Sequence, residues 1–155
     1  MNIIDLKDEM LFLDQYIRLR NKHGDRLLTQ PVNRTETEAW LRREDIVVKG
    51  LADNEVLLGV VILYVSKGGE IAFFAETPNR GIGTRLLQMI EEEAGEKKLP
   101  SIWAWVLSDN PIARHVFEKR GFVREEPEDR FFKGERKTGS KFRKYLRNHE
   151  KGEKS

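Results

Sequence analysis

Residues 70–87 read EIAFFAETPNRGIGTRLL, and this stretch decides the fold more than any other part of the chain. An apolar segment typical of a strand leads through a short glycine loop directly into an amphipathic helix, expected over residues 83–98. The first amides of a helix have no internal acceptors, and the helix dipole places partial positive charge beside them. Gly81 and Gly83 let those amides approach a ligand without an intervening Cβ. The stretch therefore predicts a site for a phosphorylated ligand.

The composition is that of one globular domain. The chain has 155 residues, of which 39% are hydrophobic and 35% charged, and its net charge of +2 is too small to indicate nucleic-acid binding. Because there is no cysteine, disulfides, thiolate metal sites and a cysteinyl intermediate are excluded, and we expect a cytoplasmic location. His23, His115 and His149 lie far apart in the sequence, so no metal-ligand spacing is present and no metal is expected.

The chain carries no membrane signal that we can identify. The longest apolar run, residues 56–65, is about half of the ~20 residues needed to cross a bilayer, and the N-terminus is charged where a signal peptide would be apolar. We expect one domain over residues 1–137, followed by a basic tail over residues 138–155. In that tail Phe142 and Tyr145, followed by Leu146, have the spacing of a short helix.

Apolar periodicity and capping residues predict three helices besides the expected helix over residues 83–98. The first covers residues 9–22 and is expected to end at Gly24, because glycine commonly follows the last turn of a helix. The second covers residues 35–43 and is expected to begin at an N-cap threonine, Thr35, which is followed three residues later by a glutamate. The third is expected to begin at Asn110, which is followed by a proline in the first turn.

The remaining apolar segments read as strands. The expected strands are residues 2–6, 46–52, 55–66, 70–75, 101–107, 122–126 and 130–135. The strand at residues 55–66 is apolar on both faces, which is typical of the middle of a covered sheet. The strand–helix–strand order over residues 70–107 predicts a right-handed parallel crossover. The last two strands are expected to form a hairpin around Pro127.

Two common phosphate-binding motifs do not fit the glycine loop. A dinucleotide-binding fingerprint requires a third glycine three residues after the second, where this chain has Leu86. A P-loop requires a lysine and then a serine or threonine after its last glycine, whereas Gly83 is followed by Thr84 and Arg85. The glycine loop therefore needs a second motif to identify it.

That second motif follows one strand later. Residues 110–122 read NPIARHVFEKRGF, and together with the glycine loop they resemble the two signature elements of the GNAT superfamily of acetyl-CoA-dependent N-acetyltransferases. The expected order of elements is also similar to the order in that family, so the resemblance covers most of the chain. It implies an α/β (α+β) fold with a mixed, mainly antiparallel sheet, flanking helices and one splayed parallel strand pair. It also implies an acyltransferase that moves an acetyl group from acetyl-CoA to an amine.

The resemblance further implies which residues hold acetyl-CoA. Backbone amides of the glycine loop would bind the pyrophosphate, and the preceding strand would pair with the pantetheine arm. The neighbouring strand end would contribute an asparagine, and the next helix a phenylalanine that packs against the arm. The implied cofactor-binding residues are Phe74, Ala75, Arg80, Gly81, Ile82, Gly83, Thr84, Arg85, Asn110 and Phe117.

Two positions depart from the family's pattern. In an ungapped match, Pro78 stands where the family usually has glutamine or arginine. Residues 70–75 also resemble the histone-type branch of the family, but only if the loop here is shorter than in that branch. Phe117 stands where the family often has a tyrosine that is taken to protonate the departing thiolate. Because phenylalanine has no proton to give, water or the acceptor's own proton would discharge the thiolate.

The expected reaction needs a base, since an alkyl amine has a pKa of about 10 and is mostly protonated at neutral pH. Glu70 and Glu76 flank the strand whose end would meet the acetyl group. Glu70 falls where histone-type enzymes of the family keep a catalytic glutamate, whereas Glu76 is nearer to the glycine loop. Both residues therefore stay as candidate bases.

The acceptor is expected to be a small molecule. The resemblance implies that the acceptor site is shaped by the first two helices and their connection, residues 18–40, together with the last hairpin. The segment 18–40 is polar and basic, which favours an anionic amine such as a nucleotide-linked amino sugar. One alternative is a protein N-acetyltransferase that acts on an N-terminus or a lysine, which an acidic groove would favour. The other alternative is a non-catalytic CoA-binding module, for which Phe117 and Pro78 are the arguments. No membrane or nucleic-acid partner is expected, and a homodimer is compatible with the sequence without being indicated by it.

Overall fold

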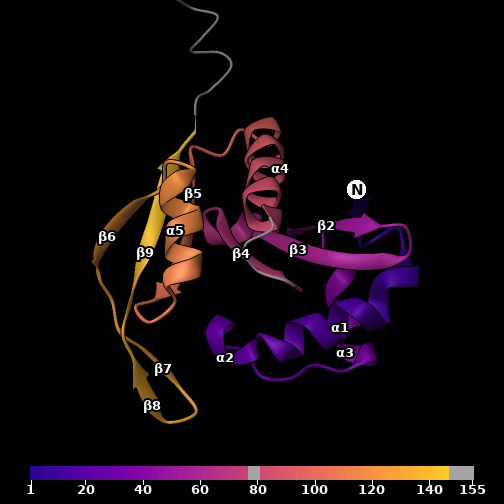
Figure 1. The fold of residues 1–155 in the computed structure, drawn as a ribbon, viewed down its shortest axis with the longest axis horizontal. Helices are drawn as coiled ribbons and strands as arrows, with labels where there is room; N and C mark the ends of the chain where they lie inside the picture. Colours follow the sequence, from indigo (N-terminus) through magenta and orange to yellow (C-terminus); the bar gives the residue numbers. More distant parts are fainter. Residues whose placement is uncertain (77–80, 147–155) are drawn as a thin grey trace, which may run out of the picture.

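The computed structural model describes residues 1–76 and 81–146, and a seven-stranded sheet forms its centre (Figure 1). The strands lie in the order β1-β2-β3-β4-β5-β9-β6, and β7 and β8 form a separate hairpin. The bounds are β1 Asn2–Asp5, β2 Ile46–Asp53, β3 Val56–Tyr64, β4 Glu70–Ala75, β5 Ser101–Leu107, β6 Val123–Pro127, β7 Arg130–Phe132, β8 Glu135–Lys137 and β9 Gly139–Tyr145. The neighbours β4 and β5 are parallel, and the other neighbouring pairs are antiparallel. The predicted mixed, mainly antiparallel sheet is confirmed.

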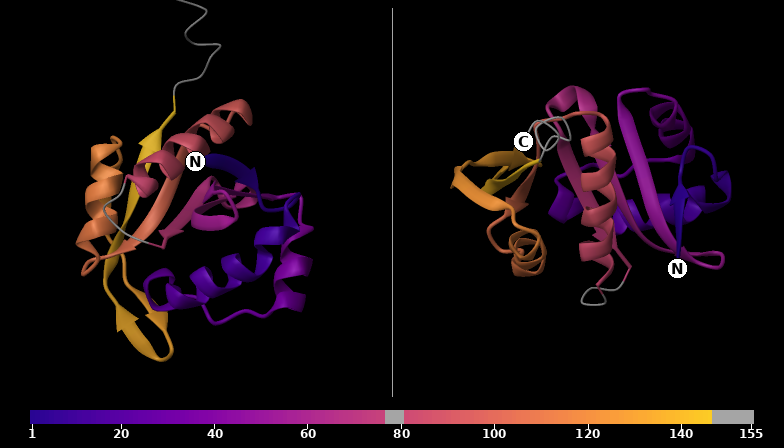
Figure 2. Two further views of the ribbon diagram at one scale, coloured as in Figure 1. Left: turned by 45° about the vertical axis from the view of Figure 1, so that its right-hand side comes forward. Right: turned by 90° about the horizontal axis from the view of Figure 1, so that it is seen from above.

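Helices cover both faces of this sheet (Figures 1 and 2). The bounds are η1 Met10–Phe12, α1 Leu13–Lys22, α2 Gly24–Leu27, α3 Arg34–Leu41, η2 Val65–Lys67, α4 Ile82–Glu96 and α5 Pro111–Lys119. On β3, Val60 and Ile62 pack into the core beneath α1, whereas Val61 and Leu63 pack into the core beneath α4. This arrangement confirms the prediction of a strand that is covered on both faces. Within the described ranges, no helix is both long and apolar enough to span a membrane.

The glycine predicted to end the first helix has a different role. Helix α1 ends at Lys22, and Gly24 begins the next helix, α2, with ordinary backbone angles. A Cβ on Gly24 would lie 2.9 Å from the carbonyl oxygen of Thr29. The residue is therefore glycine because the chain folds closely back on itself there. The predicted helix end at residue 22 is confirmed, whereas the terminating role expected of Gly24 is wrong.

The predicted N-cap of the next helix, α3, is also wrong by two residues. Asn33 is the cap: its side chain accepts from the backbone of Glu36 at 2.8 Å, and the Glu36 carboxylate accepts from the backbone of Asn33 at 3.0 Å. Thr35 and Glu38 have the same spacing two residues later, so the sequence contains two candidate capping boxes. The structure uses the earlier one.

The largest correction concerns the C-terminal segment. Residues 139–145 form β9, which lies between β5 and β6, so the expected short helix is wrong and the sheet includes residues assigned to a tail. Ser140 and Phe142 are buried, whereas the alternate Lys141 and Arg143 are partly exposed, which is the period of a strand. The abundance of Lys and Arg hid that alternation. The expected hairpin around Pro127 is wrong too, because β6 pairs with β9 and β7 pairs with β8.

The strands β4 and β5 part almost as soon as they meet. Their one register pair within the described residues is Glu70 with Trp103, whereas β3 and β4 pair over six consecutive positions. The amide of Trp103 donates to the carbonyl of Gly69 at 3.0 Å, at the end where the two strands touch. From there toward the C-terminal end of β4 the sheet is open. This confirms the expected splayed parallel pair.

Candidate active site

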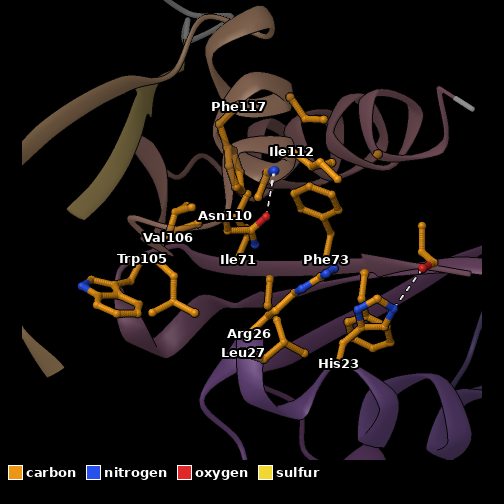
Figure 3. A pocket seen from close by; sticks show the side chains of 18 of the residues that line it. His23, Arg26, Leu27, Ile71, Phe73, Trp105, Val106, Asn110, Ile112 and Phe117 are labelled. Carbon is orange, nitrogen blue, oxygen red and sulfur yellow. Dashed lines mark hydrogen bonds between the residues drawn. The ribbon is translucent and has the colours of Figure 1, made fainter. Parts of the chain in front are cut away.

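A cavity of about 160 Å³ occupies the opening between β4 and β5 (Figure 3). Its walls are the whole of β4, the C-terminal half of β5 and the first two turns of α5. Side chains from α2 and β7 line it as well, although these elements are far from β4 in the sequence. The cavity thus joins the two layers of helices through the gap in the sheet.

The open edge of β4 presents main-chain groups to this cavity. The amide of Glu76 donates to the carbonyl of Leu58 at 2.8 Å, so Phe74, two residues earlier, also directs its main chain toward β3. The amides and carbonyls of Phe73 and Ala75 therefore face the other way, toward β5. Because β5 has already diverged, these groups have no β5 partner in the described part of the chain. An extended ligand can pair there as an additional strand would.

The N-terminus of α4 lies beyond the end of β4. Gly81 is its N-cap, with a φ of 75° and no side-chain capping bond, and the Arg85 amide makes the first helical bond, to the Gly81 carbonyl at 3.1 Å. The amides of Ile82, Gly83 and Thr84 consequently have no intrahelical acceptor. Together with the helix dipole, they form a main-chain site for an anion.

Glycine is required at positions 81 and 83 for different structural reasons. A Cβ on Gly81 would meet nothing within 4 Å, so the positive φ is what favours glycine there. A Cβ on Gly83 would lie 2.9 Å from Cε2 of Phe73, so this glycine is needed for close contact between helix and strand. The sequence suggested ligand approach for both residues. Arg80 and Pro78 lie outside the described residues.

Two residues of the second motif, Asn110 and Phe117, line the cavity. Asn110 is the N-cap of α5 and accepts from the Ala113 amide at 3.2 Å, which confirms the predicted helix start. Phe117 is 2% exposed, and its ring lies 5.2 Å from that of Phe73 and 5.0 Å from that of Phe122. Phe117 is therefore core and cavity wall at once, and it brings no hydroxyl to the site.

The two candidate glutamates lie in different environments. Glu70 is half-buried and lines the cavity. Glu76 is held in ion pairs by Lys22 and Arg18, each at 3.2 Å. The hydrogen bond from Lys22, then that from Arg18, lowers the pKa of the Glu76 carboxyl below its ordinary value. A carboxylate stabilised in this way is a poor proton acceptor, so the geometry favours Glu70.

His23 lies at the cavity without having been predicted there. Its Nε2 is 3.0 Å from the carbonyl oxygen of Ala75, and its ring stacks on Phe74 with centroids 6.0 Å apart. Burial lowers the pKa of His23, and the nearby Arg26 and Lys22 lower it further, against the opposing effect of the Ala75 bond. Because a carbonyl only accepts, Nε2 carries the proton of the neutral ring and Nδ1 is an acceptor.

Two arginines and a tryptophan complete the side of the cavity away from α4. These residues are Arg26 of α2, Arg130 of β7 and Trp105 of β5. Trp105 is a cavity wall whose Nε1 donates to the Glu128 carbonyl at 2.8 Å. Arg26 belongs to the polar segment expected to shape the acceptor site, but no sequence signal singled out either arginine, since their cavity positions depend on contacts between distant segments. The described residues contain no group of three or more potential metal ligands.

The matching family model agrees with both motifs. A model described as the acetyltransferase (GNAT) family matches residues 12–122, which is most of the chain. It includes the glycine loop, the splayed strands and the whole of α5. The comparison with curated proteins found no match.

Solved structures similar to this chain have the same fold. A ribosomal-protein-alanine N-acetyltransferase from Brucella melitensis is 17% identical with a TM-score of 0.80, over 94% of this chain and 100% of that one. A spermidine N-acetyltransferase from Vibrio cholerae, in complex with CoA and spermine, is 18% identical with a TM-score of 0.78, over 94% and 95%. A phosphinothricin acetyltransferase from Sinorhizobium meliloti, in complex with acetyl-CoA, is 13% identical with a TM-score of 0.78, over 94% and 88%. At such identities the likeness concerns the fold, and the acceptors named differ from one structure to the next.

Proposed function

Because this chain belongs to the GNAT family of acetyltransferases, we propose that it moves an acetyl group from acetyl-CoA to a primary amine of a small molecule. The observation that carries the proposal is the alignment of two main-chain features. The open edge of β4 leads toward the N-terminal amides of α4, and the cavity begins at that edge. A ligand with an extended amide arm and a diphosphate at its end fits this pair of features.

In this proposal the diphosphate binds the amides of Ile82, Gly83 and Thr84, flanked by Gly81 and by the side chain of Arg85. The main chain of Phe73 and the amide of Ala75 pair with the pantetheine arm, since the Ala75 carbonyl already accepts from His23. Asn110 contributes from the neighbouring strand end, and Phe117 packs against the arm together with Phe73. Phe74 takes a different part from the one expected, because its main chain faces β3 and its buried ring contacts Tyr16 and His23.

Glu70 is the proposed base. When bound, acetyl-CoA supplies an activated acetyl group, and the protein must supply an unprotonated amine to attack it. Glu70 takes the proton that the amine loses, while the positive charge of Arg26 disfavours the ammonium form of an amine in the same cavity. Phe117 cannot donate a proton, so water or the acceptor itself protonates the thiolate product.

A small acceptor is favoured over a protein chain by the form and charge of the site. The space beside Glu70 is a cavity of about 160 Å³ lined by arginines, whereas a basic peptide would be favoured by an acidic groove. The polar segment 18–40 led us to expect an anionic acceptor such as an amino sugar, and one of its residues, Arg26, does line the cavity.

The proposal is tested by measuring acetyl-CoA binding by calorimetry and CoA thiol release with a panel of small amines and lysine peptides. We expect binding together with thiol release that depends on a small amine. Binding without release for any amine would favour the non-catalytic alternative, and release with peptides alone would favour a protein acetyltransferase. Absence of binding would contradict the proposal as a whole.

A further inference from the structure

Arg26 is a cation without a partner at the cavity. It belongs to α2, a helix of only four residues, Gly24–Leu27. Its side chain extends from α2 into the cavity, toward Phe73 (Figure 3). Among the described residues, no hydrogen bond or ion pair engages its guanidinium. A charge placed in an otherwise largely apolar cavity is stabilised when a ligand brings the opposite charge.

Arg130 brings a second guanidinium to the same cavity from β7. Its charge lies 5.0 Å above the ring of Trp105, and its Nε is 3.5 Å from a carboxylate oxygen of Glu128. Trp105 in turn donates to the Glu128 carbonyl, so the three residues hold one another in place. The side chain of Arg130 is 34% exposed and leaves part of its guanidinium free to bind a ligand.

The segments that carry these arginines lie side by side. Residues 24–27 and 130–137 are far apart in the sequence, yet Lys133 of the β7–β8 turn forms an ion pair with Asp25 of α2 at 3.8 Å. Figure 1 shows the β7–β8 hairpin extending below the sheet toward α2. The two arginines therefore reach the cavity from a shared rim, and either could contact one bound group.

The other basic residues of this region are already engaged. Arg18 and Lys22 pair with Glu76, while Arg34 pairs with Asp14 at 2.7 Å and with Glu38. Their charges are compensated, and none of the three lines the cavity. Among the residues that the structure describes, Arg26 and Arg130 are the cations that line the cavity, the latter also paired with Glu128, and Glu70 is the carboxylate that lines it.

We propose that Arg26 and Arg130 form a clamp for an anionic group of the acceptor, which is then a primary amine that also carries a carboxylate or a phosphate. This inference rests on the proposed function and specifies its substrate class. Guanidinium groups bind such oxyanions through paired, charge-assisted hydrogen bonds. The clamp orients the amine toward Glu70 and repels acceptors with several positive charges, such as polyamines.

The test compares matched amines in a thiol-release assay at saturating acetyl-CoA. The pairs are O-phosphoethanolamine with ethanolamine, glucosamine 6-phosphate with glucosamine, and β-alanine with its amide, so phosphate and carboxylate are distinguished. We expect at least one anionic member to exceed its neutral partner in kcat/KM by about tenfold or more. Arg26→Gln should remove most of that preference, chiefly through KM, and Arg130→Gln should reduce it.

The matched control is Arg34→Gln, which removes the same charge from a guanidinium that does not line the cavity and should keep the preference. Equal rates for both members of every pair, or a preference that survives the Arg26→Gln, Arg130→Gln double substitution, would overturn the clamp. So would acetyl-CoA binding with no turnover of any pair. Calorimetry keeps the two proposals apart: a protein that binds acetyl-CoA and acetylates only neutral amines keeps its proposed function and loses the clamp, whereas one that does not bind acetyl-CoA loses both.

Discussion

The two sides of the cavity are built in different ways. The side toward α4 and α5 comes from one segment, β4 to α5, and offers mainly main-chain groups at the edge of a strand and the start of a helix. The side toward α1, α2 and β7 is assembled from distant segments and offers side chains, among them His23, Arg26 and Arg130. A site made of backbone tolerates many side chains but few changes of backbone geometry. A site made of side chains can change its ligand through single substitutions.

The largest effect that separates the two sides should come from the proposed base. Glu70→Gln removes a proton acceptor at the cavity without changing volume, and kcat should fall by about 10²- to 10⁴-fold while CoA affinity is kept. Glu76→Gln is the matched control, because Lys22 and Arg18 already hold that carboxylate in the charged form. Steady-state measurements of kcat for the two variants decide which glutamate is the base. A larger loss for Glu76→Gln than for Glu70→Gln would reverse the assignment.

A charge placed at the start of α4 should break the main-chain side. Gly81→Asp puts a carboxylate beside the free amides and the positive end of the helix dipole, so CoA affinity should fall by about ten- to a hundredfold. Gly95→Asp adds the same charge near the other end of α4, where a Cβ meets nothing within 4 Å. Calorimetric titration with CoA should show little change for Gly95→Asp. Equal affinities for the two variants would place the diphosphate elsewhere.

The contact between α4 and β4 can be tested with a smaller change. Gly95→Ala should raise the free energy of unfolding by up to about 1 kcal/mol, because alanine restricts the unfolded chain and fits the exposed helix. Gly83→Ala should give no such gain and should destabilise by about 1 kcal/mol or more, since its Cβ would lie 2.9 Å from the Phe73 ring. Urea denaturation measures both. Equal stabilisation by the two substitutions would show that the Phe73 ring can move away from a Cβ at position 83 at little cost.

The smallest expected effect concerns the pH dependence of stability through His23. The folded state lowers the pKa of His23, chiefly by burial, so below the ordinary value of about 6.5 the unfolded chain binds more protons there. His23 therefore costs stability as the pH falls from about 6.5 toward its lowered pKa, and has no effect well above 6.5. His23→Gln keeps a donor for the Ala75 carbonyl and should reduce the loss of unfolding free energy as the pH falls below about 6.5. If the free energy of unfolding of His23→Gln changes with pH between 7.5 and 5.5 as steeply as that of the original protein, this account of His23 is contradicted.

The sequence predicted the main-chain side well because its signals are local. An apolar strand, a glycine loop and an asparagine cap with a following proline depend on residues close together, and β4, β5 and the start of α5 were correctly placed. The choice between Glu70 and Glu76 could not be made, because it depends on ion pairs that Glu76 forms with α1.

The side of the cavity toward α1, α2 and β7 was less predictable, because it depends on pairing between segments that are distant in the sequence. Residues 139–145 were expected to be a tail with a short helix, yet they form a strand whose register with β5 places β6 at the sheet edge and frees β7 to reach α2. Without that pairing no pattern in the sequence brings Arg130 near Arg26. The position of His23 at the cavity was not predicted either, since a single histidine at the end of a helix has no distinguishing neighbours in the sequence.

The most direct test of the central claim is an amide-resolved NMR titration of the protein with CoA. The account predicts that the amide signals of Phe73, Ala75, Ile82, Gly83 and Thr84 shift together and saturate at one concentration. The signal of Val48, in the distant strand β2, should stay in place. A titration in which CoA binds while these five amides do not move would contradict the claim that main-chain groups at the end of β4 and the start of α4 hold the cofactor.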